Sequence, residues 1–185
     1  MRNQERLKLT VAVLAIMLLG MGQSHADLEL VEDVDLERYQ GRWYEIARLP
    51  NRFQRQCVSD VSALYELRDD GRVDVTNRCR RDDGEYAEAS GVARRSDAEG
   101  PVAALEVRFA PAWLSFLPFV WGDYRILALG DDYDHALVGS DNRRYLWILS
   151  RSTEMPESLL ERLLEVASAQ GFDTAELIMT RHDHN

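Results

Sequence analysis

Residues 41–49 have the sequence GRWYEIARL, and Pro50-Asn51 follow directly. Aromatic and β-branched residues favour extended structure, so a first β-strand is predicted over residues 42–49. Polar turns then separate further short segments of the same kind, and Asp69-Asp70-Gly71 is typical of a hairpin. Seven more strands are predicted, over residues 58–67, 72–80, 86–95, 102–110, 124–129, 136–139 and 145–150. Eight short strands at this spacing indicate an all-β barrel or sandwich.

The periodicity changes after the last of these strands. Apolar residues recur at three- and four-residue steps, at Leu159, Leu160, Leu163, Leu164 and Ala167. Pro156 suits the first position of a helix and Gly171 the position after its last turn. We therefore expect one amphipathic helix whose apolar stripe lies against an apolar surface, followed by a short strand over residues 175–179.

An eight-stranded antiparallel up-and-down barrel closes its own edges and leaves an interior able to hold a small ligand. In such a barrel the loops after strands one, three, five and seven meet at one end, here called the mouth. The loops after strands two, four and six are short, so the opposite end can close. The predicted fold class is therefore all-β, a barrel of this kind with one C-terminal helix packed outside.

The first 26 residues have the order of a secretory signal. Three basic residues lie among the first eight, residues 11–19 form an unbroken apolar run, and Ser24-His25-Ala26 supplies small residues before a cleavage site. The apolar run is shorter than the roughly 20 residues that span a bilayer, which favours a cleaved signal over an anchor. We expect residues 27–185 to form a single periplasmic domain. No cysteine lies near the cleavage point, so no lipid attachment is expected.

Charge and cysteine content narrow the function classes. Cleavage would remove three basic residues and one acidic residue from totals of 22 and 32, leaving 159 residues of net charge −12. Such a surface repels phosphates and argues against nucleic acid as a partner. Two cysteines, Cys57 and Cys79, are too few for a disulfide-dense miniprotein. Export into an oxidising compartment predicts that they pair.

Three short motifs occur in order along the chain. Gly41-Arg42-Trp43-Tyr44 opens the first strand, Asp132-Tyr133 lies in the turn before the seventh, and Arg151 ends the eighth. In these motifs the sequence resembles the lipocalin family, in particular its bacterial outer-membrane and apolipoprotein D-like members. Asp131 stands where the second motif usually has Thr, and the acylated cysteine of many bacterial members has no counterpart. The resemblance covers almost all of the chain after residue 26.

The motif residues have a structural interpretation. Trp43 is expected to close one end of the barrel with its ring, and Arg151 to lay its guanidinium over that ring. This cation–π contact would stabilise the fold by about 1–2 kcal/mol when partly desolvated. Gly41 would let the chain pass close beneath the barrel, where a side chain would clash. With Asp132 and Tyr133, these residues are predicted to hold the fold rather than a ligand.

Alternation along the strands predicts which side chains face inward. The inward set is Trp43, Glu45, Ala47, Val61, Ala63, Tyr65, Val73, Val75, Asn77, Leu105, Val107, Phe109, Tyr124, Ile126, Tyr145, Trp147 and Leu149. An apolar lining with few hydroxyl and amide groups suits an acyl chain, while plain core packing is the alternative for each residue. Ligand contacts are predicted from Ala63, Tyr65, Val75, Asn77, Val107, Phe109, Trp113, Tyr124 and Trp147.

Two features of the mouth loops favour a lipid ligand. Arginines gather there, at Arg48, Arg52 and Arg55 in one loop and Arg143 and Arg144 in another. The first three are predicted to hold a carboxylate or phosphate headgroup. Residues 111–121 are apolar and carry no charge, so they need a cover. A lid over the interior, a membrane surface and a homodimer interface all remain open for this loop.

These observations predict a non-enzymatic carrier of fatty acids or lysophospholipids, with no cofactor and no metal. A lipocalin-fold enzyme acting on a lipid or isoprenoid is the first alternative, and Glu45 is then the best internal carboxylate. A haem or metal carrier is the second, through His182-Asp183-His184, although a terminal tail rarely holds a defined site.

Overall fold

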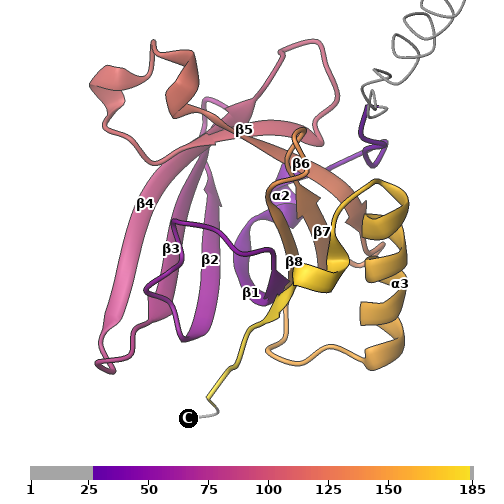
Figure 1. Ribbon diagram of the computed structural model, residues 1–185. Coiled ribbons are helices and arrows are strands. Elements are labelled where there is room, and N and C mark those ends of the chain that lie inside the picture. The colour runs from indigo at the N-terminus through magenta and orange to yellow at the C-terminus, as the bar shows by residue number, and fades with distance from the viewer. Residues whose placement is uncertain (1–26, 184–185) are drawn as a thin grey trace, which may run out of the picture.

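The computed structural model of the chain describes residues 27–183 (Figure 1). The predicted signal over residues 1–26 and the last member of the His182-Asp183-His184 cluster lie outside the described residues. Among the helices of the described part, none has the length and apolar character needed to cross a membrane.

The predicted order of strands followed by one helix is confirmed. Most strand bounds agree with the prediction within two residues. The elements in chain order are α2 (Leu36–Tyr39), β1 (Gly41–Arg48), β2 (Ser59–Leu67), β3 (Val73–Arg80), β4 (Tyr86–Arg95), β5 (Ala104–Arg108), η2 (Ala112–Leu114), η3 (Pro118–Val120), β6 (Gly122–Leu129), β7 (His135–Gly139), β8 (Leu146–Ser150), α3 (Glu157–Ala169), η4 (Thr174–Glu176) and β9 (Ile178–Met179).

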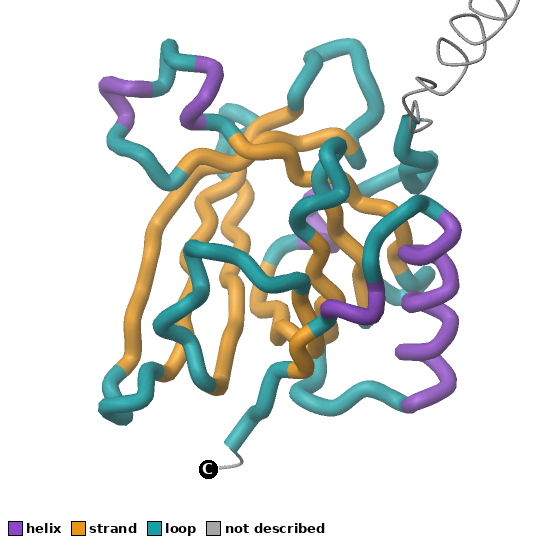
Figure 2. Tube along the Cα trace, in the orientation of Figure 1, coloured by secondary structure: helices purple, strands orange, loops and turns teal. Residues whose placement is uncertain are grey.

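Eight antiparallel strands close into a barrel (Figure 2). Each strand from β1 to β7 pairs with the next, and β8 pairs with β1 to complete the ring. The register places the start of β1 beside the last part of β2, through Gly41 opposite Tyr65. All hairpin connections therefore alternate between two ends of the barrel, as the sequence predicts for an up-and-down topology.

The C-terminal segment completes the barrel wall. Pairing between β1 and β2 stops after Tyr44, and β9 takes the place beside β1 through Ala47 opposite Met179. Beyond β9, the backbone N–H of Asp60 donates to the carbonyl of Arg181 at 2.9 Å. The strand predicted over residues 175–179 is thus shorter than expected, because η4 occupies its first part. The C-terminal segment is therefore held against the barrel as far as Asp183, whose backbone N–H donates to the Asp60 carboxylate at 2.8 Å.

Two apolar cores lie on opposite faces of the sheet. One fills the barrel interior around Trp43 and Tyr124, and the other lies between the barrel wall and α3. Leu163 and Ala167 on the inner stripe of α3 are buried in this second core, as the periodicity of the helix predicts. Figure 1 shows α3 lying along the outside of the barrel, so the helix contributes no residues to the interior.

One inward prediction is wrong because of a β-bulge. Glu45 faces Leu149 on β8, but Ala47 faces Ile148, so one extra residue of β1 lies between them. The insertion shifts the alternation by one position. Ala47 consequently packs in the outer core against α3 instead of the interior, and Arg48 takes the inward position opposite Trp147.

Candidate functional site

The closed end of the barrel is sealed by a tryptophan and an arginine. Trp43 is fully buried, and its indole N–H donates to the carbonyl of Tyr39 at 2.8 Å. The guanidinium carbon of Arg151 lies 3.9 Å from the centre of the Trp43 ring. This is the contact that the motif residues predict, and it stacks a cation on the outer face of the plug.

Arg151 also caps a short helix that the sequence analysis missed. Its Nη2 atom donates to the carbonyls of Arg38 at 3.0 Å, Tyr39 at 3.2 Å and Gln40 at 2.9 Å, at the C-terminal end of α2. A cation there satisfies carbonyls that have no partner within the helix. Partial burial lowers the pKa of Arg151 below its ordinary value. With only four residues, α2 is too short to show helical periodicity in the sequence. The only sequence feature that indicates it is Asp35, whose side chain caps its N-terminus.

The other two motifs meet at the same end. Gly41 has a φ of +97°, and a Cβ there would lie 3.2 Å from Nη1 of Arg151, which confirms the expected close approach. The Tyr133 hydroxyl accepts from the backbone N–H of Asp35 at 2.8 Å, and Arg38 stacks on the Tyr133 ring at 4.1 Å. Trp43, Arg151, Gly41 and Tyr133 thus gather around α2 at the closed end; that they hold the fold rather than a ligand stays a prediction.

Above the tryptophan plug, three tyrosine hydroxyls form a polar cluster inside the apolar core. The Tyr124 hydroxyl shares hydrogen bonds with those of Tyr39 at 2.7 Å and Tyr65 at 3.0 Å. Burial raises the pKa of Tyr65 to about 12, and burial raises the pKa values of Tyr39 and Tyr124 well above the ordinary value. All three therefore remain protonated donors at physiological pH.

Towards the mouth, the interior face of the barrel becomes accessible to solvent. Asn77 pairs with Ala63 on one side and with Ala89 on the other, so all three face the same way as Trp43. Ala63 is buried, whereas Asn77 and Ala89 are exposed. Solvent therefore reaches the inner face of the barrel at Asn77 and Ala89.

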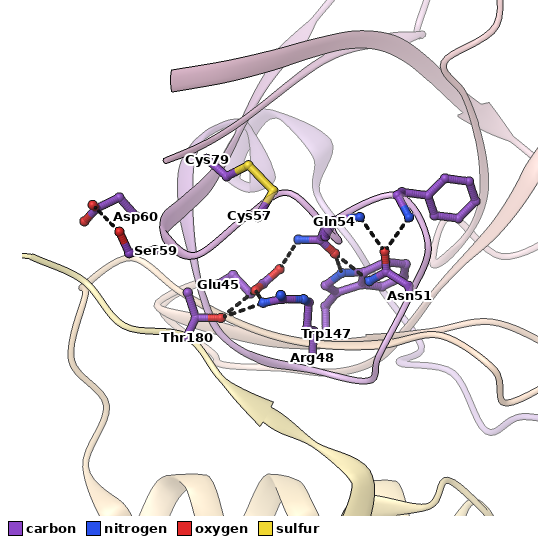
Figure 3. The surroundings of a disulfide bond; sticks show 11 residues. Glu45, Arg48, Asn51, Gln54, Cys57, Ser59, Asp60, Cys79, Trp147 and Thr180 are labelled. Carbon is purple, nitrogen blue, oxygen red and sulfur yellow. Dashed lines mark hydrogen bonds and ion pairs between the residues drawn. A yellow bond between two sulfur atoms is a disulfide. The ribbon is translucent and has the colours of Figure 1, made fainter. Parts of the chain in front are cut away.

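The opposite wall carries a buried polar network (Figure 3). The carboxylate of Glu45 accepts from Arg48 Nη1 at 2.7 Å, Thr180 Oγ1 at 2.5 Å and Gln54 Nε2 at 2.5 Å. The Gln54 carbonyl oxygen in turn accepts from the indole N–H of Trp147 at 3.0 Å. The network ties the loop of residues 49–58 and the C-terminal segment to β1. With both oxygens engaged, Glu45 is committed to this network.

Sequence reasoning missed Gln54, because an isolated glutamine in a loop carries no pattern. A partial signal lay in Asn51, whose side chain accepts from the backbone N–H groups of Phe53 at 3.1 Å and Gln54 at 3.0 Å. This local turn directs the Gln54 side chain toward the barrel (Figure 3).

The other end of the same loop is fixed by a disulfide. Cys57 and Cys79 are bonded, with 5.4 Å between their Cα atoms, which confirms the predicted pair. Because Cys79 belongs to β3, the bond joins the mouth loop to the barrel wall.

The predicted headgroup arginines differ in their surroundings. Arg48 is buried, and its charge is neutralised by Glu45. Arg52 and Arg55 are exposed in the mouth loop, and Arg52 lies 5.0 Å from the ring of Phe53. In the loop between β7 and β8, Arg144 is exposed and Arg143 donates to the carbonyl of Gln170 at 3.3 Å.

The predicted ligand contacts are mostly brought together in the barrel. Six of them pack in or against the interior core: Ala63, Tyr65, Val75, Val107, Tyr124 and Trp147. Asn77 lies on the accessible part of the same face. Phe109 is 42% exposed and lies over Gly91, where a Cβ would come within 2.8 Å of its ring. Trp113 is 73% exposed and is not part of the interior core.

Comparison with known proteins agrees with this geometry. A family model described as a lipocalin-like domain matches residues 34–182. Temperature-induced lipocalin-1 of Arabidopsis thaliana is 41% identical over 83% of this chain and 82% of its own length. Outer membrane lipoprotein Blc of Escherichia coli K12 is 41% identical over 80% of each chain. The crystal structure of lobster apocrustacyanin A1 superposes with a TM-score of 0.64 at 17% identity, covering 87% of this chain and 93% of the other, and so supports the fold alone.

Proposed function

This chain belongs to the lipocalin family, and on that premise we propose that it binds one fatty acid or lysophospholipid inside the barrel, as a non-enzymatic carrier in the periplasm. The observation that carries the proposal is the contrast along the interior face. The buried Trp43 closes one end of the barrel, while Asn77 and Ala89 are accessible to solvent towards the other end. A site closed at one pole and open at the other admits a long, thin apolar molecule from one direction.

The chemistry of the lining supports an acyl chain. Apolar residues from most of the strands form the wall, and two groups of polar side chains in it, the tyrosine cluster and the Glu45 network, are already bonded among themselves. An acyl chain can be buried against such a wall without breaking the hydrogen bonds of these two groups. Arg52 and Arg55 lie in the mouth loop, where a carboxylate or phosphate headgroup would emerge.

The surroundings of Glu45 support a binding role over catalysis. General acid–base catalysis needs a carboxyl group that can reach its substrate and exchange a proton with it. Three donors surround the Glu45 carboxylate, one of them the buried Arg48. The periplasmic location follows from the expected signal segment and accords with the outer-membrane lipoprotein name of the bacterial relative.

Adjacent residues of β4 provide a matched test. Ala89 and Ser90 are both exposed, but Ala89 faces the interior and Ser90, opposite Thr76, faces outward. Delipidated protein is titrated with a fluorescent fatty acid, and one saturable site per barrel is expected. Ala89→Trp should weaken binding by about tenfold or more, since displacing two methylene groups from the wall costs roughly 1.6 kcal/mol. Ser90→Trp should leave the affinity unchanged.

Two results would refute the proposal. One is the absence of saturable binding to any fatty acid or lysophospholipid probe. The other is equal weakening by Ala89→Trp and Ser90→Trp, which would place the probe on the outer surface.

A further inference from the structure

The loop between β5 and β6 presents three aromatic rings to solvent. Trp113, Phe116 and Phe119 are 73%, 76% and 80% exposed, the largest exposures among the large apolar residues of the described chain. Residues 111–121, called the aromatic loop below, contain no charged side chain. In Figure 2 the two short helical turns of this loop project away from the barrel. An exposed apolar surface of this kind, on a protein of net charge −10, is typical of a site that binds another molecule or a membrane.

Part of the backbone of the aromatic loop is hydrogen-bonded within the loop. Five backbone N–H groups, those of Leu114, Ser115, Leu117, Val120 and Trp121, donate to carbonyls of the same loop at 3.0–3.3 Å. Pro111 and Pro118 have no N–H to satisfy. Internal pairing lowers the cost of moving a backbone from water into the acyl region of a bilayer, which offers no hydrogen bonds in return.

The rings are held outward by a fixed base. The indole N–H of Trp121 donates to the carbonyl of Ser115 at 2.9 Å, which folds the loop back on itself. The guanidinium of Arg94 lies 3.9 Å from the Trp121 ring and is paired with Glu106 at 2.8 Å. Trp121 thus anchors the loop, while Trp113, Phe116 and Phe119 are presented to solvent.

We propose that the aromatic loop inserts into the surface of a lipid bilayer and docks the barrel there with its mouth at the membrane. Tryptophan and phenylalanine favour the interface between headgroups and acyl chains. A second copy of the chain explains the exposed rings less well than a bilayer does. Three side chains of 150–250 Å², three-quarters exposed, would bury about 450 Å² per copy, or about 900 Å² in all, below the range of stable dimers.

The charge of the loop determines what kind of membrane it fits. Because the loop is uncharged and the chain as a whole is acidic, we expect its apolar contact, rather than the exposed mouth arginines Arg52, Arg55 and Arg144, to drive the docking. Binding should therefore occur on zwitterionic phosphatidylcholine and change little with salt. The reason for docking rests on the proposed function, since the loop joins β5 to β6 at the mouth, where an acyl chain from the bilayer would enter.

The experiment measures binding to phosphatidylcholine vesicles by cosedimentation, with and without added phosphatidylglycerol. The test variant is the triple substitution Trp113→Ser, Phe116→Ser and Phe119→Ser, with Phe119→Ser alone as a milder form. The control is Met179→Ser, which removes an exposed apolar side chain (56% exposed) from β9. Vesicles with brominated acyl chains also report insertion directly, by quenching Trp113; the Trp113→Phe variant should bind but lose that quenching.

The unaltered protein and Met179→Ser should bind zwitterionic vesicles. Phe119→Ser should bind about tenfold or more weakly, and the triple variant should lose binding. The proposal is overturned if the triple variant binds as the unaltered protein does, if binding requires phosphatidylglycerol, or if the loop instead forms a dimer that the triple variant abolishes. Titration of the same variants with the fluorescent fatty acid, without vesicles, separates the two claims: retained probe binding with lost vesicle binding supports both, whereas lost probe binding in the unaltered protein counts against the carrier function alone.

Discussion

Replacement of Arg151 by methionine tests how the closed end of the barrel is held. Methionine keeps most of the length and apolar volume of arginine but removes the charge and every donor. In the folded protein, Arg151 Nε donates to the carbonyl of Tyr133 at 3.1 Å and Nη1 to that of Arg42 at 2.8 Å. Nη2 donates to the end of α2, and the guanidinium stacks on Trp43. No other described residue forms this set of contacts.

The expected cost follows from these contacts. Three nitrogens with partners contribute about 1 kcal/mol each, and the stacking adds about 1 kcal/mol. Partial solvent exposure of the Arg151 side chain reduces the total, because water replaces part of what is lost. The free energy of unfolding should therefore fall by about 3 kcal/mol, which for a domain of this size lowers the Tm by roughly 10 °C.

The assay is urea unfolding followed by circular dichroism, with Arg162→Met as the matched control. Arg162 is exposed on α3, and Nη1 donates only to the carbonyl of Ser158, one turn earlier. The control should change stability by less than about 0.5 kcal/mol. Arg151→Lys should fall between the two, because lysine keeps the charge but cannot reach several carbonyls at once. A loss below 1 kcal/mol for Arg151→Met, or one equal to that of the control, would refute the account of the closed end.

Two further predictions concern the disulfide and the tyrosine cluster. The bond between Cys57 and Cys79 spans 22 residues, so replacing both by alanine should lower the free energy of unfolding by about 3 kcal/mol in urea; a change below 1 kcal/mol would contradict it. The raised pKa values of Tyr39, Tyr65 and Tyr124 imply a stability contribution that is complete below pH 10 and is lost as the pH rises above it, for Tyr65 through its pKa of about 12. Absorbance at 295 nm should show that Tyr39, Tyr65 and Tyr124 ionise only well above pH 10 or on unfolding; ionisation of these three near pH 10 in the folded protein would contradict the buried cluster.

The strand pattern and the three motifs were sufficient to predict the barrel, because hydrophobic alternation and turn residues repeat over its whole length. The placement of Trp43 under Arg151 followed from the same motifs. Alternation alone failed at Ala47, since a single inserted residue in β1 leaves no mark in the sequence. From Trp43 to Glu45 the expected parity holds, and beyond the bulge it reverses.

Features built from isolated polar residues were harder to predict. Gln54 and Thr180 lie more than a hundred residues apart, and only the folded barrel brings both onto Glu45. The charge on Arg48 was expected at the mouth surface, but the bulge directs it inward onto the same carboxylate. Local sequence patterns cannot report such pairings, because their energy comes from tertiary contact and burial.

The most direct test of the whole account is native mass spectrometry of the protein purified without detergent, before and after exposure to fatty acids and lysophospholipids. An interior sealed by Trp43 and reachable at Ala89 should hold one lipid per chain, and Ala89→Trp should reduce its occupancy while Ser90→Trp does not. A chain that carries no lipid and gains none when either class is offered in excess would contradict the central claim.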